Sequence, residues 1–197
     1  MAIKEGGRAV FLDKDGTLIE NVPYNVDPTL IRFTTGAVEG LRLLGDRGYR
    51  LFVVSNQPGV ALGRFSEQAL SRVERHISEE LGERGVSLEG FYYCPHHPQG
   101  ALPGYAVRCS CRKPDSGLLT QAAREHGIEL TRSWMVGDIL DDIEAGRRAR
   151  CRTILINNGN ETEWDLSGER WPEALAEDLL SAAQIILASG AGSRAAQ

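Results

Sequence analysis

Two aspartates stand two residues apart at the end of an apolar run, in the stretch Ala9-Val-Phe-Leu-Asp13-Lys-Asp15-Gly-Thr. A continuous apolar run bounded by polar turn residues is typical of a strand buried on both faces. Open parallel α/β sheets bind ligands beyond the carboxyl ends of their strands, where both carboxylates would lie. Mg²⁺ would relieve the repulsion between them and bridge to phosphate oxygens. The alternative is a solvated turn, since Asp-Gly is a frequent turn pair.

Further polar groups follow later apolar runs: Ser55, Asn56, Arg112, Lys113 and Asp138. With the aspartate pair they form the set that phosphoryl transfer from a monoester needs, namely a nucleophilic carboxylate, an acid/base, and cations and donors for the phosphate oxygens. Taken alone, Lys113 also fits a solvated surface lysine, and Asp138 also fits the N-cap of the next helix. The agreement of all these groups favours the chemical interpretation.

Three of the four cysteines and a histidine gather in one short insertion, as Cys94, His96, Cys109 and Cys111. Three thiolates and one imidazole make a tetrahedral zinc set with no open position, which indicates a structural site. Such a site would staple a Gly- and Pro-rich loop over residues 94–111. His97 is an alternative ligand to His96, and the competing interpretation is three unrelated buried cysteines. Cys151 lies outside the cluster and fits a core thiol.

Strand-like apolar runs alternate with helical periodicity along the chain. Strands are expected over 9–12, 49–55, 90–94, 133–138 and 152–156, and helices over 36–48, from 66 past 81, and over 116–127, 141–150 and 172–187. This alternation predicts an α/β fold, a Rossmann-like three-layer sandwich with a central parallel sheet. The last helix is expected to turn Leu175, Leu179 and Ile186 inward. The 197 residues fit one domain over 1–197, with a frayed tail over 188–197.

The composition is that of an ordinary soluble globular protein, with 42% hydrophobic residues, 25% charged residues and a formal charge of -5. It has no basic excess that would indicate a nucleic-acid partner. No apolar segment is long enough to cross a bilayer, and no signal-like run precedes Ala9. We therefore expect a cytoplasmic monomer whose partner is a small molecule, with neither nucleic acid nor membrane bound.

The polar groups stand in the order of the motifs of the haloacid dehalogenase (HAD) superfamily of phosphohydrolases, which the chain resembles over nearly its whole length. The matching motifs are Asp13-Lys-Asp15-Gly-Thr17, Ser55-Asn56-Gln57, Lys113, and Gly137-Asp138 followed by Asp141-Asp142. The resemblance implies that Asp13 is the nucleophile and Asp15 the general acid/base. It implies that Ser55 and Lys113 clamp the phosphate. It also implies that Asp13, the Asp15 carbonyl and Asp138 hold Mg²⁺.

The segments Tyr92-Tyr-Cys-Pro-His-His-Pro-Gln-Gly100 and Cys109-x-Cys-Arg-Lys-Pro114 are similar to those of the capless, zinc-bearing branch of that superfamily. This resemblance favours His96 as the fourth zinc ligand and implies that Arg112 contacts the substrate beside Lys113. It implies Mg²⁺-dependent release of the 7-phosphate of D-glycero-D-manno-heptose 1,7-bisphosphate. The alternatives are histidinol phosphate or another small monoester as substrate and, outside enzymes, a zinc-stapled binding module.

Two positions depart from the pattern of that branch. Leu62 stands where an arginine is usual, which leaves open whether Arg64 replaces it, and Ile139 stands beside Asp138 where a lysine is frequent. Both changes remove positive charge near the predicted site. They bear on the bisphosphate substrate and leave the phosphatase chemistry unaffected.

Overall fold

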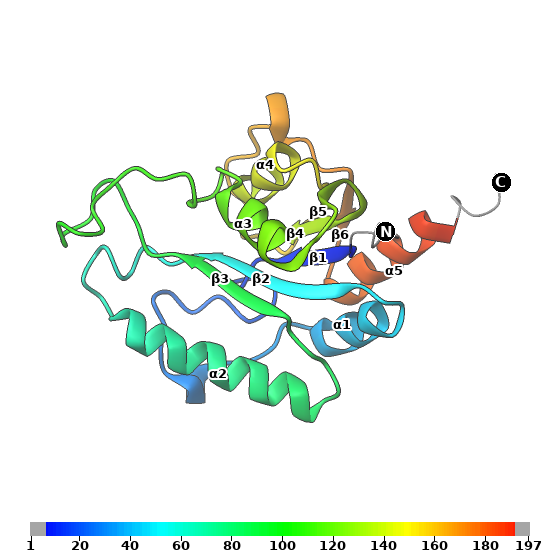
Figure 1. The fold of residues 1–197 in the computed structure, drawn as a ribbon, viewed down its shortest axis with the longest axis horizontal. Helices are drawn as coiled ribbons and strands as arrows, with labels where there is room; N and C mark the ends of the chain where they lie inside the picture. Colours follow the sequence, from blue (N-terminus) through cyan, green and yellow to red (C-terminus); the bar gives the residue numbers. More distant parts are fainter. Residues whose placement is uncertain (1–6, 192–197) are drawn as a thin grey trace, which may run out of the picture.

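The computed structural model describes residues 7–191, which form a six-stranded parallel sheet with helices on both faces (Figure 1). The strands are β1 (Ala9–Leu12), β2 (Arg50–Asn56), β3 (Gly90–Cys94), β4 (Trp134–Gly137), β5 (Arg152–Ile156) and β6 (Ala174–Ala176). The helices are α1 (Ala37–Asp46), α2 (Glu67–Glu83), α3 (Gly117–His126), α4 (Leu140–Arg148) and α5 (Leu179–Ala191). The strand order is β3-β2-β1-β4-β5-β6, so β1 lies inside the sheet. The predicted α/β fold class is confirmed.

The apolar run of β1 is continuous because the sheet is covered on both faces. Val10 and Leu12 belong to one core, which they share with buried residues of α1, α2 and α5. Ala9 and Phe11 point the other way and pack with buried residues of α3 and α4. Successive strand residues alternate between faces, so this short strand contributes to both cores. The result is the predicted sandwich of three layers.

Local signals account for the helix bounds that the sequence predicts. The hydroxyl of Ser66 accepts a hydrogen bond from the Ala69 amide at the start of α2, as an N-cap residue does. Gly127 ends α3 in the left-handed conformation, with φ 64°, and its amide bonds the Ala123 carbonyl. A glycine adopts this conformation without steric cost, which explains its place after the last helical residue.

The predicted final helix is wrong in its first half. Residues Ala174–Ala176 form β6, which pairs in parallel with β5, and Leu175 is 53% exposed instead of facing inward. Leu179 and Ile186 are buried in α5, as predicted. A strand of three residues is too short to display a period of its own, so the apolar residues around it were attributed to the helix that follows.

The helix α5 continues to Ala191, so residues 188–191 of the predicted tail are helical. Positions 192–197 of that tail lie outside the described residues. All described strands belong to one sheet, while the single domain over residues 1–197 stays a prediction. No helix in the described part of the chain is both long and apolar enough to cross a membrane.

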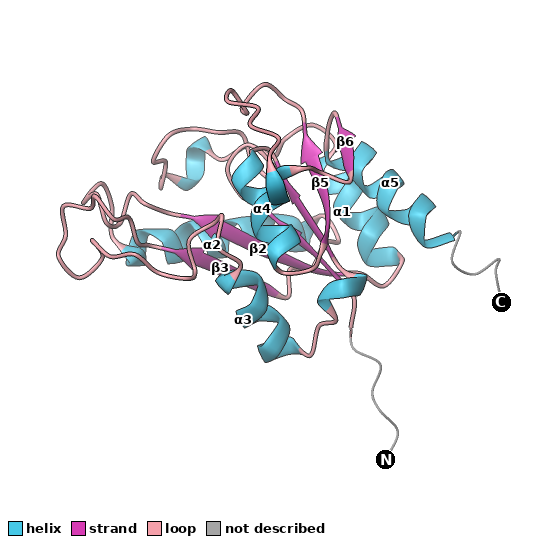
Figure 2. Ribbon diagram, turned by 90° about the horizontal axis from the view of Figure 1, so that it is seen from above, coloured by secondary structure: helices cyan, strands magenta, loops and turns pink. Residues whose placement is uncertain are grey.

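The strands are parallel, so their carboxyl ends lie at the same edge of the sheet. Figure 2 shows the molecule from above. Leu12 pairs with Val53 of β2 and with Val136 of β4. The residues that follow these three positions therefore come together beyond the carboxyl ends of the strands. This register brings the predicted motifs to one place.

Candidate active site and metal centres

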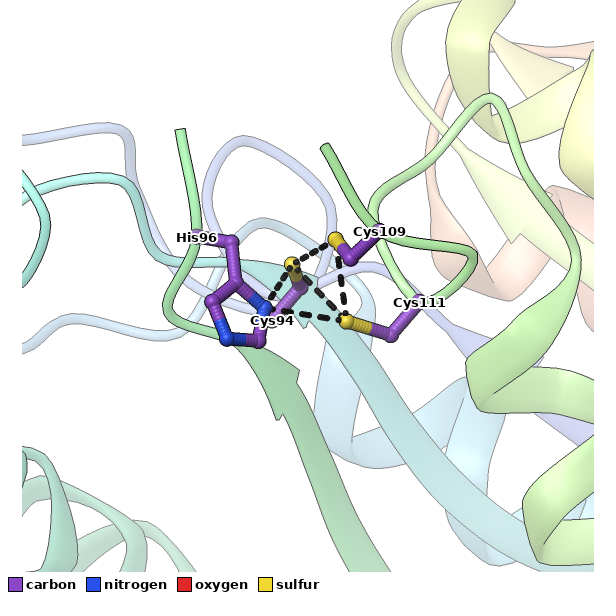
Figure 3. A group of neighbouring side chains, drawn as sticks. All are labelled: Cys94, His96, Cys109 and Cys111. Carbon is purple, nitrogen blue, oxygen red and sulfur yellow. Dashed lines mark hydrogen bonds between the residues drawn. The ribbon is translucent and has the colours of Figure 1, made fainter. Parts of the chain in front are cut away.

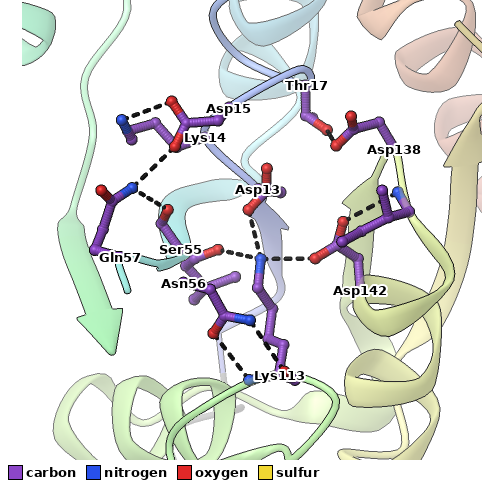
Figure 4. Close-up of polar contacts among 12 residues, drawn as sticks. Asp13, Lys14, Asp15, Thr17, Ser55, Asn56, Gln57, Lys113, Asp138 and Asp142 are labelled. Carbon is purple, nitrogen blue, oxygen red and sulfur yellow. Dashed lines mark hydrogen bonds and ion pairs between the residues drawn. The ribbon is translucent and has the colours of Figure 1, made fainter. Parts of the chain in front are cut away.

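The ammonium group of Lys113 lies at the centre of the predicted active site (Figure 4). Its Nζ donates to Asp13 Oδ1 at 2.5 Å and to the Val54 carbonyl oxygen at 2.9 Å, and it pairs with Asp142 Oδ1 at 2.6 Å. The Lys113 side chain is 2% exposed. A surface lysine would instead keep its ammonium in water. The alternative of a solvated surface lysine is therefore wrong.

The side chain of Asn56 holds the backbone of Lys113. Its Nδ2 donates to the Lys113 carbonyl oxygen at 3.0 Å, and its Oδ1 accepts from the Lys113 amide at 3.0 Å. Both polar atoms of the amide are thus used on one residue. A contact of this side chain with phosphate stays a prediction, whereas its role in placing Lys113 is visible in the structure.

Three buried carboxylates form the candidate magnesium centre, with oxygen atoms of Asp13, Asp138 and Asp142 all within 4.8 Å of one another. Asp142 already uses both oxygens, one on Lys113 and the other on the Ile139 amide at 3.3 Å. Hard oxygen ligands in this number suit Mg²⁺, which binds through one or two carboxylates and keeps several waters. Asp13 and Asp138 stay the predicted ligands of the ion, and oxygen atoms of both belong to this cluster.

Electrostatics at this centre also call for a cation. Burial raises the pKa of Asp13 to about 7, against the opposing effect of Lys113, and the charge of Asp142 adds to the rise. Burial, followed by the charge of Asp13, raises the pKa of Asp138 to about 6. A divalent cation beside both groups would favour their ionised forms.

Asp138 does not cap α4, so the alternative interpretation of this residue is wrong. The N-cap position of α4 is Ile139, and the first helical amide, that of Leu140, donates to Glu161 Oε2 at 2.7 Å. The Asp138 carboxylate instead accepts from Thr17 Oγ1 at 3.0 Å and from Asn160 Nδ2 at 2.7 Å. These two donors orient the carboxylate toward the centre.

The carboxylate of Asp15 has an environment different from that of Asp13. Its side chain is 31% exposed, against 11% for Asp13, and it pairs with Lys14 Nζ at 2.7 Å. Gln57 Nε2 donates to Asp15 Oδ2 at 2.9 Å and to the hydroxyl of Ser55 at 2.8 Å. Two aspartates with separate partners suit two separate chemical roles.

The cysteines and histidine of the insertion converge (Figure 3). The three sulfur atoms of Cys94, Cys109 and Cys111 lie 3.1–3.5 Å apart, and His96 Nδ1 lies 3.6 Å from Cys94 Sγ and 3.4 Å from Cys111 Sγ. Zinc–sulfur bonds of about 2.3 Å in a tetrahedron would set the sulfurs about 3.8 Å apart, so the group needs only a slight opening to take the ion. His97 instead accepts from the Gln99 amide through Nδ1. The interpretation as three unrelated cysteines is wrong.

Clefts of similar size flank the carboxylates. One of about 260 Å³ is lined by Arg108, Arg112 and Lys113, with Arg112 Nη1 3.4 Å from the His96 carbonyl oxygen. The other, of about 280 Å³, is lined by residues that include Asp15 and Tyr24. The guanidinium groups of Arg108 and Arg112 in the first cleft could bind an anionic group of a ligand.

The two departures from the pattern have different surroundings. Arg64 is exposed and its guanidinium carbon lies 5.7 Å from the centre of the Tyr24 ring, so its charge reaches the rim of the second cleft. Arg64 thereby supplies a cation two residues after Leu62. Ile139 is half-buried at the start of α4, and its side chain brings no charge to the centre.

Sequence comparison agrees with this geometry. The chain is 40% identical over 156 residues to the D-glycero-β-D-manno-heptose-1,7-bisphosphate 7-phosphatase of Photorhabdus laumondii, which covers 79% of this chain and 83% of that protein. It is 36% identical over 168 residues to the protein of the same name from Escherichia coli K12, with coverages of 81% and 88%. The chain belongs to the heptose-1,7-bisphosphate 7-phosphatase family. It is thus a phosphomonoester hydrolase, and residues 110–182 also match the family model described as HAD-hydrolase-like.

The structure of this chain is similar to solved structures with the HAD-like fold. A HAD-like phosphatase from Mesorhizobium loti superposes with a TM-score of 0.79 at 30% identity, over 92% of this chain and 88% of that one. The D,D-heptose 1,7-bisphosphate phosphatase of B. bronchiseptica, complexed with magnesium and phosphate, has a TM-score of 0.75 at 24% identity, over 92% and 99%. HAD phosphatases use Mg²⁺, and the carboxylates of this family member fit that ion.

Several residues of the family member's site were not singled out from the sequence. Asp142 follows Asp138 by four residues, about one helical turn. This spacing indicates a second carboxylate on the side of Asp138. Gln57 directly follows the predicted phosphate-binding residues of β2. Asn160 comes from a polar loop without periodicity, and no local signal connects it with Asp138.

Proposed function

We propose that the chain hydrolyses the 7-phosphate of D-glycero-β-D-manno-heptose 1,7-bisphosphate and leaves the heptose 1-phosphate. The proposal rests on one observation above the others, the pairing of Asp13 at the end of β1 with Lys113, beside a second aspartate that has separate partners. The names of the curated relatives supply the sugar and its β-anomer.

The chemistry divides between the two aspartates. An oxygen of Asp13 attacks phosphorus, so that an acyl–phosphate bond forms as the bond from phosphorus to the sugar oxygen breaks. Asp15 gives its proton to the departing sugar oxygen. In the second step Asp15 takes a proton from water, the water oxygen attacks phosphorus, and inorganic phosphate leaves Asp13 free. The two residues thus return to their starting states.

The remaining residues hold the phosphoryl group. The ammonium of Lys113 and the hydroxyl of Ser55 would donate to the phosphate oxygens. Mg²⁺, held by Asp13, Asp138 and the carbonyl oxygen of Asp15, would supply the positive charge that neutralises these oxygens. Because Lys113 is buried and paired on three sides, its charge is in place before the substrate arrives.

The sugar's anomeric phosphate would lie away from Asp13, in the cleft of Arg108 and Arg112. Lys113 is already used at the reacting phosphate, so a second phosphate needs its own cation. Arg112 is the nearest candidate along the chain, and planar guanidinium groups bind phosphate with two hydrogen bonds.

Zinc is proposed at Cys94, His96, Cys109 and Cys111. The convergence of four suitable ligand atoms within one insertion supports this metal. The insertion ends directly before Arg112 and Lys113, so a zinc ion there would fix the backbone that carries both cations. Monomeric state and cytoplasmic location stay predictions.

The decisive experiment measures phosphate release in magnesium buffer. Both anomers of heptose 1,7-bisphosphate are compared with fructose 1,6-bisphosphate and histidinol phosphate, with Asp13→Asn as the inactive control. We expect the β-heptose bisphosphate to have the highest kcat/KM and the variant to be inactive but folded. A preference for histidinol phosphate would show that the chain acts on the alternative substrate. Turnover by Asp13→Asn would refute the role of Asp13 as nucleophile.

A further inference from the structure

Lys14, which stands between the two aspartates, is a buried charged residue. Lys14 is 1% exposed, and its Nζ lies 2.7 Å from Asp15 Oδ1. In the described part of the chain this is the one carboxylate within ion-pair distance of that ammonium. Burying an ammonium is costly even when it is paired, because the loss of hydration can exceed the gain from the ion pair, so this position needs a reason beyond stability. The proposed chemistry assigns no task to Lys14.

A second buried donor holds the other oxygen of the same carboxylate. Gln57 is 5% exposed, and its Nε2 lies 2.9 Å from Asp15 Oδ2 and 2.8 Å from Ser55 Oγ. One amide group therefore connects the proposed acid/base with the proposed phosphate clamp. With Lys14 on Oδ1 and Gln57 on Oδ2, rotation of the carboxylate is restrained from both sides (Figure 4).

The restrained carboxylate is accessible from solvent, because the Asp15 side chain is 31% exposed. Lys14, Asp15 and Gln57 line the cleft of about 280 Å³, together with the loop that carries Tyr24. Asp13, by contrast, takes its cation from Lys113. Each aspartate thus has its own lysine, although only one residue separates them.

We propose that Lys14 and Gln57 are positioning residues that hold Asp15 in the orientation from which it protonates the leaving oxygen. This inference rests on the proposed acid/base role of Asp15. A general acid must keep its proton within hydrogen-bond reach of the leaving atom, and a carboxylate held at both oxygens keeps that geometry. Neither residue touches the reacting phosphorus in this scheme.

The test uses the leaving group as a readout. First-turnover rates with excess enzyme are measured for p-nitrophenyl phosphate, whose phenolate departs without a proton, and for an alkyl phosphate, whose alkoxide needs one. General acids contribute typically about 10²–10⁴-fold. We expect Lys14→Met and Gln57→Leu to slow alkyl phosphate by at least about 10-fold and p-nitrophenyl phosphate by less than about 3-fold.

Two further variants make the outcome decisive. Lys14→Arg should restore most of the alkyl phosphate rate, because it returns a cation to the pocket, and Asp15→Asn should show the largest selective loss. Equal slowing of both substrates by Lys14→Met and Gln57→Leu, or no slowing, would overturn the positioning role. If Asp15→Asn itself shows no selectivity, the acid/base assignment fails instead. Thermal unfolding of each variant checks the fold, and Gln57→Leu carries the test if Lys14→Met does not fold.

Discussion

At the scale of single residues, the site is a balance of buried charges. Three carboxylates, Asp13, Asp138 and Asp142, lie around one ammonium, that of Lys113. One ammonium cannot balance three carboxylates, and burial raises the pKa of all three. Asp142 pairs with Lys113 through one oxygen and accepts from the Ile139 amide through the other, so it holds Lys113 and the start of α4.

Replacing Asp142 should destabilise the protein. Asp142→Ala leaves Lys113 with one buried carboxylate partner instead of two and leaves the Ile139 amide without its acceptor, which should cost about 1–3 kcal/mol. Asp141→Ala is the matched control, because its pair with Arg170 is partly exposed and worth less than about 1 kcal/mol. Urea unfolding measures the free energy of unfolding of both variants. An equal decrease for the two would contradict the structural role of Asp142.

Magnesium should stabilise the protein more at alkaline pH. The pKa of Asp13, about 7, and that of Asp138, about 6, lie above their ordinary value of 3.8. Without metal, their contribution to stability is fully present below pH 3.8 and is lost as the pH rises through 6 to 7. Because Mg²⁺ binds the ionised groups, the rise in Tm on its addition should be larger at about pH 8 than at about pH 5.5. An equal rise at both values would refute this.

At the scale of elements, short loops and helix ends carry the site. The cysteine-bearing insertion over residues 94–111 leads directly into Arg112 and Lys113, and the loop after β5 supplies Asn160 to Asp138. Neither loop has a core of its own. Their order depends on ligands and caps at a few named atoms.

Removal of zinc should loosen the insertion. Metal binding at such a site is coupled to local folding, so Cys109→Ser should lose the zinc, lower Tm and expose residues 94–111 to proteolysis. Cys151→Ala is the matched control, since that buried thiol lies outside the cluster. Elemental analysis should find one zinc per chain in the control and none in Cys109→Ser, whereas absence of zinc from the unmodified protein would disprove the site.

The start of α5 should depend on Asp178. Its carboxylate accepts from the Ser181 amide at 2.7 Å and from the Ser181 hydroxyl at 2.6 Å, and these hydrogen bonds lower the pKa of Asp178. Asp178→Ala should cost about 1 kcal/mol near neutral pH. A lowered pKa means that this stability is present above the ordinary value and is lost as the pH falls through the folded value. The difference in the free energy of unfolding between the unmodified protein and Asp178→Ala should therefore become smaller in acid. A difference that stays constant with pH would contradict the capping role of Asp178.

At the scale of the whole molecule, the parallel sheet makes one working edge. The carboxyl ends of β1, β2 and β4 meet there, and the clefts on either side of the carboxylates are lined by loops. The described residues include no second domain that covers this edge. We propose that loop side chains such as Arg112 recognise the far end of a substrate.

Arg112 should separate binding of the bisphosphate from chemistry. Arg112→Met removes the cation proposed for the anomeric phosphate and should raise KM for heptose 1,7-bisphosphate about 10-fold or more, as a charged hydrogen bond worth about 1.5–3 kcal/mol implies. The KM of a monophosphate such as p-nitrophenyl phosphate should change little. Steady-state kinetics on the two substrates measure this difference, and an equal rise for both would place Arg112 at the reacting phosphate.

Sequence alone determined the parallel α/β fold, the aspartate pair and the cysteine cluster. These rest on local signals, namely apolar runs of strand length, residue types and short spacings. Tertiary structure decided the partners. Lys113 meets Asp13 across 100 residues of sequence, Gln57 turns to Asp15, and Asn160 turns to Asp138. Such pairings follow from strand register and loop path, and β6 escaped detection because three residues are too few to show a period.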